Sequence, residues 1–322
     1  MKFARLYIEE KAYAYPLTAK ILNEFKNLPI INIENYKDVF CKSSQSFRAQ
    51  KQNPSIILAI KKENFLYPLP EICQKFGHLN AYYSSILLNC PYDCGYCYLQ
   101  GAYPSANMLL YVNVEDFISE VKSMSVSDCY VAVSYDTDLL AMERYFGLCN
   151  TWIRETKDLK NTEIEIRTKS VDVTSINEFN DNVVFAFTLS PNEVCNKYER
   201  GSPALAKRLQ AVKYMIDKGY KVRLVFDPIL KIDNYIQVYK EFFEQVFSSI
   251  NWEQLVNISI GTFRISSKYL KNMRQDLGPA SCELAFYPFE VKNGIAFYHD
   301  KHNIKEQILE EIRNYIPLVK CF

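Results

Sequence analysis

The sequence has little glycine, histidine and tryptophan, and it has no long hydrophobic run. Its 322 residues include only 9 glycines, 3 histidines and 2 tryptophans. The longest apolar stretches, such as residues 82–90, are too short and too polar to span a bilayer, and residues 1–13 lack the apolar segment of a signal peptide. We therefore expect a cytoplasmic protein without a membrane segment.

Neither sign of charge is in excess. The chain has 38 basic and 37 acidic residues and is 48% hydrophobic, so it is neither a disordered tail protein nor a strongly basic nucleic-acid binder. Any site for a polyanion must be a local patch.

What the sequence does have is ten cysteines, unevenly spaced. Three of them, Cys90, Cys94 and Cys97, lie within eight positions in CPYDCGYC. A disulfide framework is typical of small secreted chains, and a disulfide within the triplet is unfavourable in a reducing cytoplasm. We interpret the seven single cysteines as buried apolar residues or surface thiols: Cys41, Cys73, Cys129, Cys149, Cys195, Cys282 and Cys321.

Beyond residue 80, short apolar runs alternate with amphipathic stretches, which is typical of βα units and a parallel sheet. Right-handed crossovers between such strands predict an α/β barrel or a curved open sheet, with the active site at the carboxyl ends of the strands. Strands are expected at 82–88, 128–134, 163–168, 183–189, 221–227 and 255–261, and helices at 114–124, 137–156, 170–179, 202–219 and 234–249.

The two ends of the chain have different patterns. Residues 1–80 predict a small α/β elaboration, with strands at 4–9, 29–33 and 55–62, a helix at 17–27 and a polar loop at 42–54. Residues 282–300 predict a hairpin with Asn293-Gly294 as a type I′ turn, followed by a helix at 303–316. We expect divisions of 1–80, 81–275 and 276–322, with no flexible linker between them.

The cysteine triplet indicates a metal or cluster site, because crowded thiolates in a loop usually share a soft centre. A structural zinc ion needs four ligands, and no fourth ligand is near, since His78 is the only histidine within 200 residues. Three cysteines suit a [4Fe–4S] cluster with one iron left open.

The spacing C-x₃-C-x-aromatic-C resembles the signature of the radical S-adenosylmethionine superfamily. Within it, CYLQ at 97–100, YVNVEDF at 111–117 and residues 187–222 are similar to the spore photoproduct lyase family. The resemblance implies a partial (β/α)6 parallel barrel, with an N-terminal α/β elaboration and a C-terminal hairpin plus helix. It also implies a [4Fe–4S] cluster and S-adenosylmethionine, which is cleaved to a 5′-deoxyadenosyl radical.

As a substrate, the resemblance implies a thymine dimer photoproduct in damaged DNA, and as an electron donor a flavodoxin or ferredoxin. Flipping such a lesion out of the duplex requires DNA contacts. The expected basic and aromatic segments are residues 46–52, 266–274 and 289–294, although charged loops are usually solvated faces.

The resemblance also implies roles for individual residues. Cys90, Cys94 and Cys97 would bind the cluster, and Tyr96 and Tyr98 would line the adenine and a radical path or simply exclude water. The remaining implied contacts to S-adenosylmethionine are Lys169 for the carboxylate, Thr188 and Ser190 as hydroxyl donors, Ser134 and Asp136 for the amino group, and Gly261 beside the adenine.

Five residues keep alternative interpretations. Thr188 and Ser190 could be solvated strand-end hydroxyls. Arg264 could face the barrel mouth or form a salt bridge at its rim, and Glu199 and Arg200 could contact the cofactor or form a cap and a surface pair.

The sequence departs from the family at the end of the second strand. The family has a cysteine there that returns a hydrogen atom to the product radical, whereas VAVSYDTD has Tyr135. Cys129 and Cys149 lie at the other end of the strand and inside the next helix. Tyr135 is then either a hydrogen donor or a wall residue.

Three hypotheses follow for the function. The first is a DNA repair lyase, and the second is a radical enzyme of the same family that acts on a modified nucleotide, a peptide or a small molecule. The third is an iron–sulfur protein without turnover, which Lys169 and Arg264 disfavour.

Overall fold

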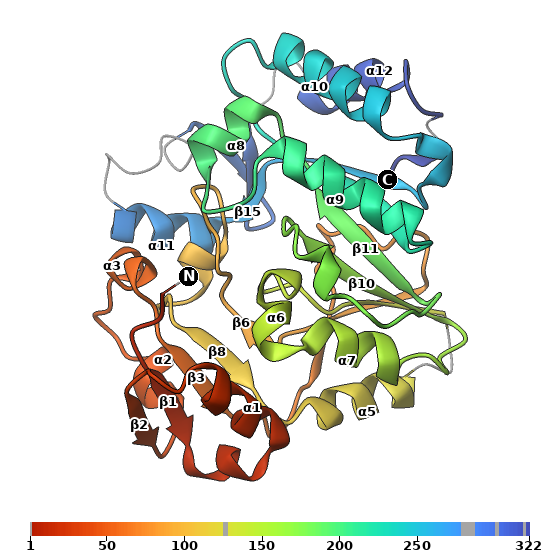
Figure 1. Cartoon of the computed structure of the whole chain (residues 1–322). Helices are drawn as coiled ribbons and strands as arrows, with labels where there is room; N and C mark the ends of the chain where they lie inside the picture. Colours follow the sequence, from red (N-terminus) through yellow and green to blue (C-terminus); the bar gives the residue numbers. More distant parts are fainter. Residues whose placement is uncertain (1, 125–127, 278–286, 300–302, 318–319) are drawn as a thin grey trace.

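The computed structural model describes residues 2–124, 128–277, 287–299, 303–317 and 320–322. Within these residues, six parallel strands and one antiparallel edge strand form a curled sheet in the order β14-β13-β11-β10-β9-β5-β4 (Figure 1). The strands are β4 (Leu66–Pro68), β5 (Asn80–Ser84), β9 (Cys129–Ala132), β10 (Thr162–Thr168), β11 (Val183–Thr188), β13 (Lys221–Ile229) and β14 (Ile258–Thr262). This is the partial parallel barrel that the sequence predicted.

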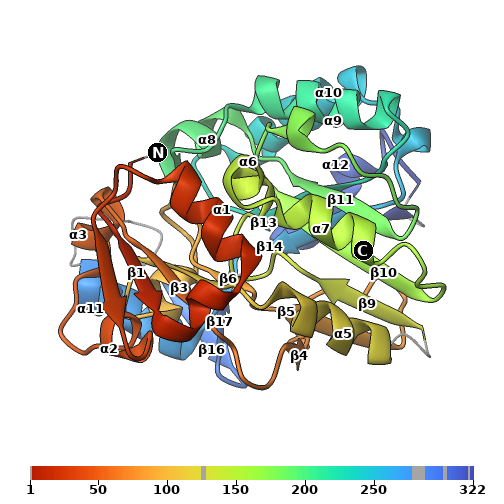
Figure 2. The ribbon, with the colours of Figure 1, turned by 60° about the horizontal axis from the view of Figure 1, so that its bottom comes forward.

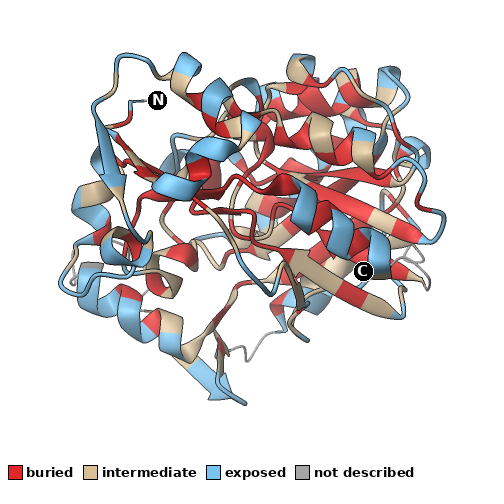
Figure 3. Ribbon diagram, turned by 90° about the horizontal axis from the view of Figure 1, so that it is seen from below, coloured by how far each residue is buried: buried red, intermediate tan, exposed pale blue. Residues whose placement is uncertain are grey.

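The central strands are buried on both faces, which explains their unbroken apolar sequences. Every residue of β9 and β11 is buried. Helices α5 (Val114–Met124), α7 (Leu148–Glu155), α9 (Leu205–Asp217) and α10 (Tyr235–Ser249) run along one side of the sheet (Figure 2). Figure 3 shows their outer turns exposed and the strands beneath them buried.

The strand expected at 82–88 is in fact divided between two sheets. Residues up to Ser84 belong to β5, and β6 (Leu87–Leu88) joins a second sheet, in the order β2-β1-β3-β8-β6. The other members are β1 (Leu6–Glu9), β2 (Ile30–Ile33), β3 (Ile56–Ala59) and β8 (Met108–Tyr111), the last of which was not predicted. Leu87 and Leu88 are buried against β8, so their apolar character reflects the core of the second sheet.

The N-terminal elements otherwise follow the prediction. Strands β1, β2 and β3 lie within the expected ranges, and helix α1 (Pro16–Glu24) begins one residue before the expected helix and ends three residues earlier. The polar loop expected at 42–54 contains a short helix, α3 (Phe47–Gln52), whose first turn is capped by the Ser46 hydroxyl. Strands β6 and β8 follow residue 80 in the sequence but join this sheet. The expected divisions of the chain at residues 80 and 275 stay predictions.

The helix expected at 137–156 is interrupted. A 3-10 turn at Leu140–Met142 leads into α6 (Glu143–Phe146), and Gly147 then separates α6 from α7 with a φ of 73°. The side chain of Glu143 accepts hydrogen bonds from the backbone N–H groups of Cys149 and Asn150, at 2.6 and 3.0 Å, so it caps the new helix.

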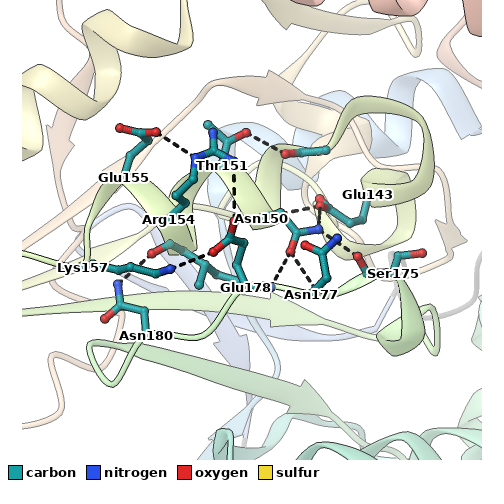
Figure 4. A network of polar contacts seen from close by, with 12 residues as sticks. Glu143, Asn150, Thr151, Arg154, Glu155, Lys157, Ser175, Asn177, Glu178 and Asn180 are labelled. Carbon is teal, nitrogen blue, oxygen red and sulfur yellow. Dashed lines mark hydrogen bonds and ion pairs between the residues drawn. The ribbon is translucent and has the colours of Figure 1, made fainter.

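The helix expected at 170–179 does not form, and only a 3-10 turn at Val173–Ser175 is present. Figure 4 shows the reason, which is a network between α7 and this connection. The Asn150 side-chain oxygen accepts from the backbone N–H groups of Asn177 and Glu178 at 2.9 and 3.1 Å. These donors are satisfied without helix formation, so the amphipathic pattern of residues 170–179 is not sufficient to predict a helix.

The C-terminal hairpin is confirmed where it is described. Strands β16 (Phe289–Lys292) and β17 (Ile295–Tyr298) pair around Asn293 and Gly294, whose φ values of 50° and 76° fit a type I′ turn. Strand β15 (Arg264–Ser266) extends the hairpin, and α12 (Ile304–Ile312) follows it. Residues 282–286 and 300 of the predicted hairpin lie outside the described residues.

None of the helices in the described ranges has the length and apolar character needed to cross a membrane.

Helix α11 (Ser267–Leu277) packs closely on α4 (Leu99–Ala102), the helix that follows the cysteine triplet. A β-carbon at Gly101 would lie 2.0 Å from the carbonyl oxygen of Tyr269, and the Asn272 amide donates to the Gly101 carbonyl at 2.9 Å. Position 101 requires glycine because the backbones of α4 and α11 are in contact there.

Gly101→Ala should therefore reduce the free energy of unfolding by about 1–3 kcal/mol, because the backbone of α11 must move to accept a methyl group. Chemical denaturation of the purified protein measures this. The matched control is Gly219→Ala, where φ is +82° but no atom lies within 4 Å of the added carbon. A smaller loss of unfolding free energy for Gly101→Ala than for the control would contradict the predicted steric clash with α11.

Candidate active site

A cavity of about 280 Å³ opens at the carboxyl ends of the parallel strands. Cys90, Cys94 and Cys97 line one part of it, so the fold brings the triplet to the edge of the sheet where the sequence placed the site. Other lining residues follow or end the strands: Ser134 and Tyr135 after β9, Thr168 and Lys169 at β10, Thr188 at β11, and Arg264 just after β14.

The cysteine loop is attached to both sheets. It leaves β6 through Asn89, whose φ of 69° reverses the chain and whose amide donates to the carbonyls of Ser105 and Asn107, each at 2.7 Å. It then forms β7 (Asp93–Cys94), which pairs antiparallel with β12 (Glu199–Arg200). The loop is therefore positioned by backbone pairing before any cofactor binds.

The three thiols suit an iron–sulfur cluster. Burial raises the pKa of Cys90 to about 12 and also raises the pKa values of Cys94 and Cys97, so the thiolates need positive charge beside them. In the described part of the chain, no three Cys, His, Asp or Glu side chains converge as ligands of a single metal ion. A cuboidal cluster fits this arrangement, because each cysteine binds a different iron.

Lys169 provides a positive charge in the same cavity. Burial opposes its charge, but the neighbouring Cys94 and Glu199 outweigh burial and raise the Lys169 pKa. Its Nζ lies 5.7 Å from the centre of the Tyr96 ring, a cation–π distance. A half-buried ammonium at a strand end suits the carboxylate that the family resemblance implies.

Glu199 is a buried ion-pair residue, an arrangement that neither of its two alternatives from the sequence included. It pairs with Arg208 of α9, and both side chains are fully buried. The Tyr96 hydroxyl donates to it, and so does the Ser190 hydroxyl at 2.9 Å. Burial opposes the carboxylate, yet Lys169 and Arg208 hold the Glu199 pKa down at about 2.

The neighbours of this ion pair have structural partners. Arg208 also donates to the Thr188 carbonyl at 3.1 Å, leaving the Thr188 side chain to line the cavity. Ser190 is buried and bonds to Glu199, and it does not line the cavity. Arg200 is exposed and lies 3.3 Å from Asp93, so it forms the surface pair.

Ser134 and Asp136 are both committed to internal hydrogen bonds. The Ser134 hydroxyl donates to the Arg167 carbonyl at 2.9 Å and accepts from the Arg167 N–H at 2.6 Å. Asp136 accepts from the hydroxyls of Ser85 at 2.5 Å and Tyr98 at 3.0 Å, and it does not line the cavity. Their proposed contacts to an amino group stay predictions.

Gly261 and Arg264 form one unit with Asp227. Arg264 pairs with Asp227 through two hydrogen bonds, at 2.9 and 3.0 Å. A β-carbon at Gly261 would lie 2.6 Å from the Arg264 guanidinium and 2.7 Å from the Asp227 carboxylate. Gly261 therefore makes room for this ion pair, and Arg264 both lines the cavity and forms the salt bridge.

The sequence prediction missed several residues of the cavity. Asp138 is buried and accepts from the Thr168 hydroxyl and the Lys169 N–H, each at 2.7 Å. Asp138 lies three residues after Tyr135, beyond the end of a strand, and this position could have identified it from the sequence. Lys51, which lies in the segment 46–52 expected to meet DNA, donates to the Cys90 carbonyl.

Cys73 was predicted to be a buried apolar residue or a surface thiol, and it lines the same cavity. It lies in the connection between β4 and β5, and its Sγ is 3.9 Å from the Tyr135 hydroxyl. No spacing pattern links the two residues, because 62 positions separate them in the sequence.

Comparison with known proteins places this site in a family. The family model described as spore photoproduct lyase matches residues 2–278. The spore photoproduct lyase of Bacillus subtilis (strain 168) is 23% identical over 264 residues, which cover 76% of this chain and 73% of the relative. That of Geobacillus sp. (strain Y412MC61) is 21% identical over 266 residues, which cover 79% and 76%.

Solved structures agree in fold. A spore photoproduct lyase mutant with bound AdoMet and dinucleoside spore photoproduct has a TM-score of 0.83 at 17% identity, covering 98% of this chain and 96% of that chain. Another mutant with the dinucleoside has a TM-score of 0.84 at 17% identity, covering 98% of both chains.

The half-barrel and the family match define an enzyme of the radical S-adenosylmethionine class of lyases. Within that class, the chain belongs to the spore photoproduct lyase family.

Removing the Glu199 charge tests the ion pair that holds the cysteine loop. Glu199→Gln should reduce the free energy of unfolding by about 3 kcal/mol at neutral pH, because it leaves the Arg208 charge buried without its partner. The folded pKa of Glu199, about 2, is below its unfolded value of roughly 4.3. The difference between wild type and variant should be complete above about pH 5 and shrink as the pH falls toward 2.

Urea unfolding at several pH values measures this difference. Glu178→Gln, on the surface network of Figure 4, is the control and should change stability little. A stability difference between wild type and Glu199→Gln that grows as the pH falls would contradict the lowered pKa of Glu199.

Proposed function

We propose that this protein is a DNA repair lyase that uses a [4Fe–4S] cluster and S-adenosylmethionine to cleave a thymine dimer photoproduct. The observation that carries the proposal is one cavity in which the cysteine triplet, Lys169 and tyrosines meet at the ends of parallel strands. Relatives with the same fold are spore photoproduct lyases with a bound dinucleoside photoproduct.

Cys90, Cys94 and Cys97 would hold the cluster, which together with S-adenosylmethionine would supply a 5′-deoxyadenosyl radical for hydrogen abstraction from the substrate. Lys169 would pair with the carboxylate of S-adenosylmethionine from its place beside Cys94 and Tyr96. Tyr96 is held by Glu199, and Tyr98 by Asp136 and the Tyr135 carbonyl, so both rings are fixed beside the cluster loop.

The surface beside the cysteine loop is formed by α3 and α11, which lie side by side in Figures 1 and 2. The Arg48 N–H donates to Asp276 at 3.3 Å across their contact. These helices contain most of the residues expected to meet DNA, and their contacts with the cysteine loop and with α4 support a damaged strand as the substrate.

The function is tested by reconstituting the cluster anaerobically, adding S-adenosylmethionine, a reductant and a lesion-containing dinucleotide, and measuring 5′-deoxyadenosine and repaired thymine. We expect both products. Formation of 5′-deoxyadenosine without repair would reject the lesion as the substrate and favour an enzyme of the same family with a different substrate. The reason for this alternative is Tyr135, which stands at the strand end in place of a cysteine. Absence of 5′-deoxyadenosine would favour an iron–sulfur protein without turnover.

Lys169→Met should weaken S-adenosylmethionine binding about tenfold to hundredfold, because a charge-assisted hydrogen bond contributes about 1.5–3 kcal/mol. Equilibrium binding to the reconstituted protein measures the effect, with iron content confirming that the cluster is intact. Lys207→Met, on the exposed side of α9, is the matched control and should bind like wild type. Equal affinity of all three proteins would refute this role for Lys169.

A further inference from the structure

Two lysines reach the cysteine triplet from two separate pockets. Lys169 lines the large cavity at the strand ends. Lys51, near the end of α3, lines a second and much smaller pocket, whose wall also includes Cys90, Cys94 and Cys97. Lys51 is not part of the wall of the large cavity, and Lys169 is not part of the wall of the small pocket. Each lysine therefore approaches the cysteines from a different side.

Helix α3 is fixed to the chain that supports the cysteine loop. The Gln50 side-chain oxygen accepts a hydrogen bond from the Ser105 hydroxyl at 2.9 Å. The Ser105 carbonyl in turn accepts from the amide of Asn89, the residue before Cys90, at 2.7 Å. Because Gln50 directly precedes Lys51 in the helix, these contacts determine where Lys51 lies relative to the triplet.

The Lys51 ammonium is directed at the cysteine loop and keeps its charge there. It donates a hydrogen bond to the Cys90 carbonyl, and the side chain is half-buried. Its Nζ lies 6.0 Å from the centre of the ring of Phe47, which is buried. Within the described ranges, no carboxylate forms an ion pair with Lys51. Its positive charge therefore acts mainly on the loop.

This charge favours negative charge on the triplet. Burial raises the pKa values of Cys90 and Cys97, and the charge of Lys51 opposes the increase at both thiols. An electron added to a cluster bound by these thiolates would increase the negative charge at the same place. A cation that stabilises the thiolates therefore also stabilises the reduced cluster, and net charge nearby is one of the factors that set the potential of such clusters.

The two lysines differ once S-adenosylmethionine is bound. Lys169 would pair with its carboxylate, which neutralises the Lys169 charge. Lys51 is outside the large cavity, so the ligand does not reach it.

We propose that Lys51 raises the reduction potential of the cluster bound by the triplet, as the positive charge that stays beside it when S-adenosylmethionine is present. The inference rests on the cluster of the proposed function. It also gives Lys51 a role different from the DNA contact expected of its segment.

The step concerned is the transfer of one electron from a low-potential iron–sulfur or flavin carrier to the cluster. The carrier is oxidised and the cluster is reduced, no covalent bond forms or breaks, and no proton moves. The cluster with its thiolates gains one negative charge. Lys51 stabilises this more negative state, so a given carrier reduces a larger fraction of the protein.

The test is a redox titration of the reconstituted protein, followed by the EPR signal of the reduced cluster. At a fixed potential, Lys51→Met should lower the ratio of reduced to oxidised cluster about tenfold, which lowers the midpoint potential of a one-electron couple by about 59 mV. Lys51→Arg should keep a potential close to that of wild type. Iron content confirms that each variant holds a full cluster.

The titration is repeated with saturating S-adenosylhomocysteine. This ligand keeps the amino and carboxylate groups but has no sulfonium to be cleaved, so the cluster stays intact during the measurement. The difference between wild type and Lys51→Met should persist, because the ligand neutralises Lys169 and not Lys51.

Lys51→Gln separates the charge from the hydrogen bond. Glutamine can still donate to the Cys90 carbonyl but has no charge, so its potential should be lowered like that of Lys51→Met. If Lys51→Met fails to hold a cluster, Lys51→Gln and Lys51→Arg provide the same comparison. Lys42→Met removes an exposed positive charge from the chain before α3, outside both pockets, and is the matched control.

A wild-type potential in Lys51→Met or Lys51→Gln, at full cluster content, would overturn the inference and leave the proposed function intact. An equal decrease in Lys42→Met would also overturn it, because any nearby positive charge would then have the same effect. If wild type takes up no cluster, the proposed function fails and this inference fails with it.

Discussion

The buried ion pair between Glu199 and Arg208 is the interaction on which the site depends. It joins the start of a short strand to α9 in the protein interior, where both side chains are fully buried and neither charge is stable alone. Glu199 is also the strand partner of Cys94, so the same residue fixes the backbone of one cysteine of the triplet. Its remaining hydrogen bonds orient Tyr96 and Ser190. Through its backbone and its carboxylate, Glu199 therefore sets the position of the loop, of the Tyr96 ring and of the end of β11.

Much of the fold could be predicted because parallel strands buried on both faces have continuous apolar sequences. Strands β9, β10, β11, β13 and β14 were identified in this way, and the type I′ turn was identified from the Asn293-Gly294 pair. Residues 82–88 show the limit of the method. Their apolar pattern is real, but it does not say that Leu87 and Leu88 belong to a different sheet from Ser84. Sheet membership depends on long-range packing, which a local pattern does not contain.

The site was predictable to a similar degree. The cysteine spacing identified the triplet, and the family resemblance pointed to Lys169 and Thr188; all of these residues line the cavity. The partners of Ser134, Asp136 and Gly261 were not predictable, because each is fixed by a side chain or backbone group from another element. Cys73 is the clearest example, since it approaches Tyr135 only after the chain has turned from β4 to β5.

The cysteine loop spans the junction between the two sheets. Its first end continues from β6, which belongs to the N-terminal sheet, and its second end is paired with β12, beside the barrel. Cys90 is therefore held on the side of the N-terminal sheet, where Lys51 donates to its carbonyl, and Cys94 on the side of β12. The two sheets share one buried core, so the spacing of the three thiols depends on how firmly that core is packed. Substitutions deep in the core, far from any cysteine, would then alter the spacing of the thiols.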